Sequence, residues 1–311
     1  MRILCATDLL PKSDAAVDRA AMIARGLDAD LSLVHVVASS RSEDALERRV
    51  QRALTSMTRF RVPRWQHRAV PNVLLRAGNP ASEVVRVLRE ARAQLVVLGP
   101  HRRRRVRDAL GGTIAEKVLG ARCCPVLIVR REPLTAYRNI LLALDLSPAS
   151  GEVVETAESL IRTTGAASAV IHAFEPPYSG VFGHVQPDME SVGAANCAER
   201  YEAKNALQRV LTRRSQEPER YDLILSSAFP AEAVLRAIAR KQPDLLVMGT
   251  RGHGRVLRGL LGSVTDRVLR SVACDVLIVP RGSLERSAPV IKQGARHFAT
   301  VSLSPSASGS G

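Results

Sequence analysis

The chain carries one sequence pattern twice, and this repetition constrains its fold more than any other feature. The segment NPASEVVRVLREARAQLVVLGP, from Asn79, matches FPAEAVLRAIARKQPDLLVMGT, from Phe229, 150 positions later. The same offset relates CPVLIV at 124–129 to CDVLIV at 274–279. A chain of 311 residues is long enough for two domains that each bury their own hydrophobic core. The repeat therefore predicts two homologous domains.

Near the start of each half the offset is 137, and it takes Asp8 to Asp145. The second half consequently carries 13 extra residues, the difference between the two offsets. The segment EPPYSGVFGHVQPDM contains Pro and Gly and is the expected place for them, as a loop. The predicted domains span 1–132 and 136–281. A Ser- and Gly-rich tail, 282–311, is expected to be disordered.

Apolar runs alternate with helical patterns within each half. In AEAVLRAIARK, for example, Val234, Leu235 and Ile238 recur at helical spacing. Continuously apolar strands that alternate with helices indicate a parallel sheet covered on both faces, so we expect two tandem doubly wound, Rossmann-like α/β domains. Ligands of such sheets bind beyond the carboxyl ends of the strands, where the strand order reverses. The strands of the second half are expected at Ile140–Leu144, Ala169–Ala173, Asp222–Ser226, Leu245–Met248 and Val276–Val279.

The net charge of +15 raises the question of a nucleic-acid partner. Aromatic residues make up only 3% of the chain, so the stacking platforms of single-strand binding proteins are missing and nucleic acid is not expected as a partner. A solvated basic surface or an anionic small ligand explains the charge instead. No apolar run is long enough to cross a bilayer, and MRILCATD resembles a first strand rather than a signal peptide. A cytoplasmic protein without a membrane partner is expected.

The cysteines and histidines show no spacing typical of a metal site. Cys5, Cys124 and Cys274 each adjoin a strand-like run, where a reduced thiol behaves as a small core residue. His35 and His172 fall at equivalent positions in the second strand of each half. We expect strand histidines with hydrogen-bonded rings rather than ligands.

A glycine-rich turn in the second half is the strongest functional signal. The sequence VMGTRGHGRVLRGLLGSVTDRVL places Gly249 and Gly252 directly after a strand and Gly262-Ser263 at the start of a helix. Glycines allow a backbone turn and the close approach of a ligand, and successive N–H groups form an anion-binding concavity. The helix N-terminus adds free N–H donors and a favourable dipole. Phosphate binding is favoured over a plain glycine connection with a serine N-cap.

Two common phosphate motifs do not fit this turn. A Walker-type loop needs a lysine before the hydroxyl residue, and Gly262-Ser263 has none. The dinucleotide fingerprint needs a third glycine where Leu257 stands. The residues alone thus indicate a nucleotide held by a different kind of loop.

The turn resembles the ATP-binding pattern of the universal stress protein family. Gly249-x-x-Gly252, nine residues and then Gly262-Ser263 carry the resemblance, and Asp145 ends the first strand as in that family. The similarity extends over both halves. The chain therefore resembles a tandem member of the family, with two adenine nucleotide α-hydrolase-like domains. It implies an ATP cofactor, with or without Mg²⁺. The binding residues that it implies are Asp145 and Ala173 near the adenine and ribose, Gly249, Thr250, Gly252 and His253 around the phosphates, and Gly262, Ser263 and Val264 from the helix.

The first half departs from this pattern. Pro100 follows Gly99, and Arg102 replaces the middle glycine. Proline removes an N–H donor, while arginine adds bulk where backbone should meet phosphate. Either the site is dead, or guanidinium groups replace the lost donors in an altered anion site. Both alternatives predict one nucleotide per chain.

The leading functional hypothesis is a stress-response protein that binds ATP in its C-terminal domain and signals through nucleotide occupancy to an unidentified protein partner. The alternative is a nucleotide-independent adaptor or scaffold. An ATP pyrophosphatase of the related superfamily would need a Ser-Gly-Gly loop after the first strand, which is absent. No catalytic constellation is evident, so no enzyme is predicted; slow ATP hydrolysis or self-phosphorylation at Ser263 or Thr265 stays open. The family pairs domains through their last strands, which implies an internal pseudo-dimer or a homo-oligomer.

Overall fold

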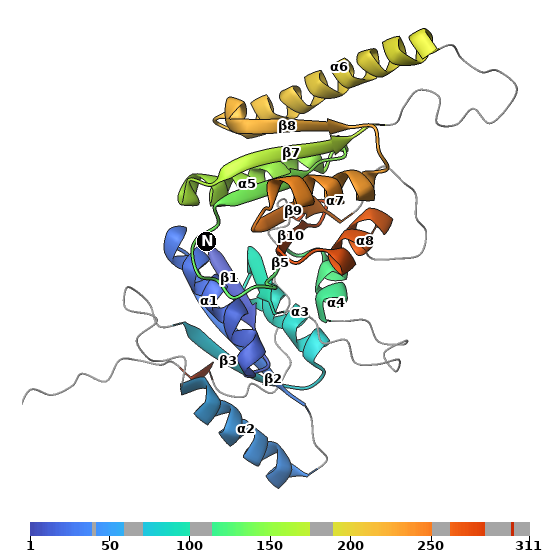
Figure 1. Ribbon diagram of the computed structural model, residues 1–311. Helices are drawn as coiled ribbons and strands as arrows, with labels where there is room; N and C mark the ends of the chain where they lie inside the picture. The colour runs from blue at the N-terminus through green and yellow to red at the C-terminus, as the bar shows by residue number, and fades with distance from the viewer. Residues whose placement is uncertain are drawn as a thin grey trace, which may run out of the picture. The chain divides into compact units, whose positions relative to one another are not determined.

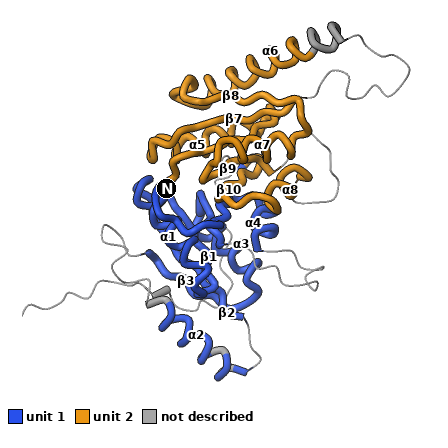
Figure 2. Tube along the Cα trace, in the orientation of Figure 1, with its two compact units in different colours: residues 1–136, 283–311 blue, residues 137–282 orange. Residues whose placement is uncertain are grey.

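The computed structural model describes residues 1–38, 42–58, 71–99, 114–174, 189–250, 262–283 and 300–301 (Figure 1). The chain divides into two compact units, residues 1–136 with 283–311 and residues 137–282 (Figure 2). The described part of each unit is a mainly parallel sheet with helices packed against it.

The first unit has the strand order β11-β3-β2-β1-β4-β5, in which only β11 is antiparallel to its neighbour. Its elements are β1 (Arg2–Ala6), α1 (Pro11–Gly26), β2 (Asp30–Val37), α2 (Glu43–Thr58), β3 (Asn72–Ala77), α3 (Pro80–Glu90), β4 (Leu95–Leu98), α4 (Ile114–Ala121), β5 (Val126–Ile128) and β11 (Thr300–Val301). The tail predicted to be disordered thus contributes the short strand β11. The other tail residues from 284 onward lie outside the described residues.

The second unit has the strand order β10-β9-β6-β7-β8, and all of these strands are parallel. Its elements are β6 (Asn139–Ala143), α5 (Ser150–Thr164), β7 (Ala167–Ala173), α6 (Met189–Arg214), a short 3-10 helix (Pro218–Arg220), β8 (Tyr221–Ser226), α7 (Pro230–Lys241), β9 (Leu245–Gly249), α8 (Ser263–Ser271) and β10 (Asp275–Val279). The five predicted strands are confirmed, with ends that differ by at most two residues. The predicted doubly wound fold is also confirmed.

Burial explains why these segments become strands and helices. Leu141 in β6 and Val247 in β9 are completely buried, as expected for central parallel strands that are covered on both faces. Pro230 at the start of α7 favours a helix beginning, because its fixed φ suits the first turn. α7 buries Val234 and leaves Arg236 exposed, so its apolar face packs on the sheet.

The helices of the second unit form two packed pairs. α5 contacts α6, and α7 contacts α8. Right-handed crossovers place helices on opposite faces when the chain moves in opposite directions across the sheet. From β6 the chain moves outward to β7 and β8, and it then returns to β9 and β10. The pair α5 and α6 therefore covers one face, and the pair α7 and α8 covers the other.

The buried cysteines behave as core residues, as predicted. Cys5, Cys124 and Cys274 are buried free thiols. Burial raises the pKa of Cys5 above its usual range, and it raises the pKa of Cys124 to about 12. Because the thiolate is the reactive and metal-binding form, both groups are inert in the folded chain. Within the described ranges, no three His, Cys, Asp or Glu side chains come together as a metal site requires.

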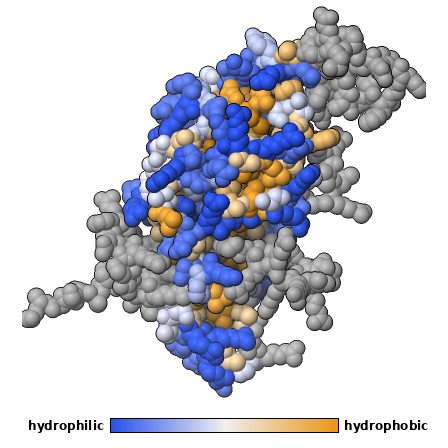
Figure 3. Space-filling view, viewed as in Figure 1, coloured by the Kyte–Doolittle hydropathy of each residue, from blue (hydrophilic) through white to orange (hydrophobic). Residues whose placement is uncertain are grey.

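The surface in view is predominantly polar. Figure 3 shows hydrophilic residues intermixed with smaller hydrophobic areas. Among the helices in the described part of the chain, none combines the length and the apolar character needed to span a bilayer.

Candidate functional site

A cavity of about 740 Å³ lies at the carboxyl ends of the strands in the second unit. β6 and β9 are neighbours in the sheet, but the helices that follow them, α5 and α8, lie on opposite faces. The two connections diverge at this point, and such a divergence forms the usual ligand crevice of a doubly wound sheet. The cavity is therefore located where the strand order predicts a ligand.

Most of the predicted binding residues meet at this cavity. Those that line it are Asp145, Ala173, Gly249, Gly262, Ser263 and Val264. Thr250, by contrast, is buried and is not among the lining residues. Gly252 and His253 lie outside the described residues.

Asp145 organises the turn that follows β6. Its Oδ1 accepts hydrogen bonds from the backbone N–H of Ser147 and the hydroxyl of Ser150, both at 3.0 Å. Leu146, between them, has a φ of 59°, which is costly for a branched residue and needs such local support. The other oxygen, Oδ2, is buried and has no hydrogen-bond partner in the described part of the chain. A buried acceptor without a donor is unfavourable, so this oxygen is prepared to accept a hydrogen bond from a ligand.

The first unit repeats this turn without the buried acceptor. Asp8 Oδ1 accepts from the backbone N–H of Leu10 at 3.0 Å and from the hydroxyl of Ser13 at 2.5 Å. Leu9 has a φ of 60° and is equivalent to Leu146. Asp8 is exposed, however, so water can satisfy its second oxygen. The two halves thus share a turn geometry but differ in the burial of the carboxylate.

The N-terminus of α8 is fixed against the end of β9. The backbone N–H of Gly262 donates to the carbonyl oxygen of Thr250 at 2.8 Å, and the Thr265 hydroxyl donates to that of Gly249 at 3.1 Å. The N-cap is Gly262, not Ser263, and glycine has no side chain of its own that could cap the helix. The N–H groups of the first turn have no intrahelical acceptor, and such groups can bind an anion.

The two hydroxyl groups considered for phosphorylation differ in access. Thr265 is 3% exposed and its hydroxyl is engaged with Gly249. Ser263 is exposed and lines the cavity. Of these two, only the Ser263 hydroxyl is accessible to a ligand.

The strand histidines have hydrogen-bonded rings, as predicted. Nδ1 of His172 donates to the carbonyl oxygen of Leu144, and Nδ1 of His35 donates to that of Thr7, both at 2.8 Å. Burial lowers the pKa of His35, although its bond to Thr7 partly opposes the shift. Each histidine thus ties the second strand of its unit to the end of the first.

Comparison with known proteins assigns the chain to a family. The sequence profile of the universal stress protein family matches residues 1–130 and, a second time, residues 136–280. The chain belongs to the universal stress protein family. Because the profile matches twice, this universal stress protein is a tandem, two-domain member.

Relatives support the tandem organisation. A universal stress protein of Mycolicibacterium smegmatis is 28% identical over 302 residues, which cover 89% of this chain and 96% of the relative. A single-domain universal stress protein of Thermus aquaticus is 35% identical over 145 residues, 46% of this chain and 98% of its own. The relatives thus include one that matches nearly the whole chain and one that matches a single half.

Solved structures share the fold. A universal stress protein from Archaeoglobus fulgidus aligns with a TM-score of 0.60 at 18% identity, over 90% of this chain and 98% of its own. A functionally unknown protein from Pseudomonas aeruginosa aligns with a TM-score of 0.61 at 16% identity, over 90% and 92% of the two chains. At these identities the likeness concerns the fold alone.

One wall of the cavity in this universal stress protein has no counterpart among the predicted residues. It is formed by one face of α6, with the residues Glu199, Glu202, Ala203, Ala206 and Arg209. Their spacing of three and four marks one side of a helix and is visible in the sequence. The sequence does not tell which side of the helix meets the cavity, because that depends on how α6 packs.

Proposed function

We propose that the C-terminal half of this universal stress protein binds ATP in the cavity at the ends of β6, β7 and β9, and that nucleotide occupancy regulates its interaction with a protein partner. The observation that carries the proposal is the meeting of two ligand-binding features in one cavity. They are the buried Asp145 Oδ2, which has no hydrogen-bond partner among the described residues, and the N-terminus of α8, whose N-cap is a glycine. The first suits hydrogen-bond donors, and the second suits an anion. A nucleotide has hydrogen-bond donors on its ribose and base, and its phosphates are anionic.

The phosphate end of ATP fits the side of the cavity formed by α8. The lining includes Gly262, Ser263 and Val264 at the start of this helix. Their backbone N–H groups and the helix dipole favour negative charge, and the Ser263 hydroxyl adds a donor. Gly249 lines the same side and, without a Cβ, leaves its backbone accessible. Gly252 and His253 remain predicted phosphate contacts.

The nucleoside end fits the side of the cavity formed by the first two strands. Asp145 Oδ2 would accept a hydrogen bond from a ribose hydroxyl or a base amine. Ala173 ends β7 beside the apolar lining residues Val153, Ile171 and Met248, which would pack against the base. A cavity of about 740 Å³ falls within the range of small-molecule sites. Mg²⁺ would arrive with the triphosphate.

Removing the phosphate contacts tests whether function depends on the nucleotide. We expect Gly252→Val combined with Ser263→Ala to abolish ATP binding, since the valine side chain and the lost hydroxyl remove contacts on both sides of the phosphates. Binding is measured by calorimetry, and stress survival is measured in a deletion strain that expresses the variant. Regulation by ATP predicts that binding and survival are lost together.

The repeat offers a matched control for this experiment. Arg102 and Thr113 occupy the equivalent positions in the first half. Arg102→Val combined with Thr113→Ala should leave ATP binding unchanged. Full survival of a strain whose protein no longer binds ATP would contradict the regulatory function and favour a nucleotide-independent adaptor.

A further inference from the structure

We infer that α6 supplies a ligand-selective wall of the cavity, in which Glu199 and Glu202 accept hydrogen bonds from the uncharged end of the ligand. The inference rests on the proposed nucleotide function and adds the residues that decide which nucleotides are accepted. Both residues lie outside the phosphate-binding motif, on α6, which follows the predicted insertion of the second half; nearly all of that insertion lies outside the described residues.

The carboxyl-terminal end of α6 is anchored to α5, which fixes the wall in place. Arg214 forms an ion pair with Glu155 at 3.1 Å and lies so close to Gly151 that a Cβ there would be 2.9 Å from its Nε. Two further bonds tie the segment after α6 to the same helix. Tyr221 donates to the buried Glu158 at 2.5 Å, and Arg162 donates to Gln216 at 3.0 Å.

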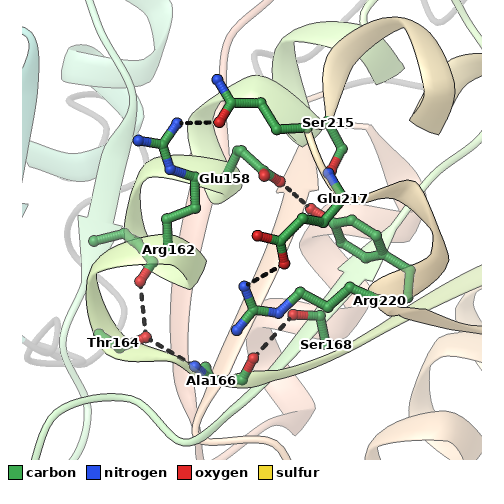
Figure 4. Close-up of polar contacts among 11 residues, drawn as sticks. Glu158, Arg162, Thr164, Ala166, Ser168, Ser215, Glu217 and Arg220 are labelled. Carbon is green, nitrogen blue, oxygen red and sulfur yellow. Dashed lines mark hydrogen bonds and ion pairs between the residues drawn. The ribbon is translucent and has the colours of Figure 1, made fainter.

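These bonds belong to a wider polar cluster between α5 and the chain that follows α6. Figure 4 shows Glu158 and Arg162 directed toward the segment that carries Ser215 and Glu217. Burial and the hydrogen bond to Glu158 raise the pKa of Tyr221, so its hydroxyl stays protonated and continues to donate. The anchor is therefore maintained across the physiological pH range.

The amino-terminal part of α6 extends past the end of β8 (Figure 1). Glu199 and Glu202 of α6 are exposed, line the cavity and make no hydrogen bond or ion pair within the described residues. The cavity face between them and Arg209 consists of Ala203 and Ala206, whose methyl groups leave room for a ligand. The two carboxylates thus have no protein partner within the described residues and face an open space, where a ligand can replace the water bound to them.

The charges of the cavity walls orient a nucleotide, because the carboxylates of Glu199 and Glu202 outweigh Arg209, the one cation of α6 among the described residues that line the cavity. The N-terminus of α8 attracts the phosphates from one face of the sheet, whereas Glu199 and Glu202 stand on α6, which covers the other face. Carboxylates repel phosphate and, when ionised, only accept hydrogen bonds. The neutral end of the ligand is therefore directed toward α6, where a ribose hydroxyl or the exocyclic amine of the base can donate to them.

Ligand analogues distinguish these two donors. The dissociation constants of ATP, 2′-deoxy-ATP and inosine triphosphate are measured by calorimetry for the unaltered chain and for Glu199→Ala with Glu202→Ala. We expect the substitutions to weaken ATP binding about tenfold, as for the loss of a hydrogen bond to a charged group. One analogue lacks the group that donates to Glu199 and Glu202. It should bind the unaltered chain about tenfold more weakly than ATP, and the double substitution should not weaken its binding further. If 2′-deoxy-ATP behaves in this way, the donor is the ribose hydroxyl; if inosine triphosphate does, the donor is the exocyclic amine of the base.

Glu219→Ala is the matched control, because Glu219 is an exposed carboxylate of the same unit that does not line the cavity. Both positions on α6 are exposed and alanine favours helices, so the double variant should fold. Unchanged affinities in the double variant, or an equal change for all three ligands, would overturn the selective role of α6. Failure of the unaltered chain to bind ATP would instead overturn the proposed function, and this inference with it.

Discussion

Asp145→Asn is expected to weaken ATP binding by about 10- to 100-fold, the effect of losing a hydrogen bond to a charged acceptor. Asparagine keeps one oxygen to accept from Ser147 and Ser150, so the turn after β6 should persist. It replaces the buried Oδ2, which has no partner among the described residues, with an NH₂ group, which donates and does not accept. Calorimetric titration with ATP measures the difference, and circular dichroism verifies that the fold is unchanged.

The first unit again offers the control. Asp8 accepts the equivalent pair of hydrogen bonds, but it is exposed. Asp8→Asn should leave ATP affinity within about twofold of the unaltered chain, well below the effect of a lost charged hydrogen bond. Equal losses in the two variants would mean that the carboxylate acts through the stability of the turn and not through contact with the ligand.

The largest loss of stability is expected from Leu141→Ala. Leu141 lies in β6 at the centre of its sheet and is completely buried, so truncation removes apolar contacts and leaves a cavity. Such substitutions typically lower the free energy of unfolding by about 2–5 kcal/mol. Because the chain contains two units, urea unfolding is followed by hydrogen exchange in peptides of residues 137–282.

An exposed leucine provides the comparison. Leu134 is 88% exposed, so Leu134→Ala should change the free energy of unfolding by less than about 0.5 kcal/mol. A loss from Leu141→Ala that is no greater than this value would show that β6 does not form part of a packed core.

Much of the fold follows from the sequence because the information is local and repeated. Runs such as LLVMG in β9 are apolar at every position, which is typical of a central parallel strand. Because the two halves align at known offsets, a strand or helix predicted in one half predicts the same element in the other. The ends of strands are harder to predict from the sequence than their centres. Ala167, which begins β7, is neither strongly apolar nor a turn residue, so the sequence does not mark this boundary.

The site was predictable only where its residues follow strand ends or begin a helix. Asp145, Gly249 and Ser263 have such positions, and the topology brings them to one cavity. Thr250 is adjacent to Gly249, but it is buried. A sequence motif does not tell whether a residue is turned toward the ligand or into the core. The wall formed by α6 depends on its packing against α5, which involves residues far apart in the chain.

The central claim is that one half of the chain holds a nucleotide between the Asp145 turn and the N-terminus of α8. Calorimetric titration of ATP into the unaltered, nucleotide-free protein tests it most directly. The account predicts saturation at one ATP per chain. Saturation at two equivalent sites, or no binding at all, would contradict it.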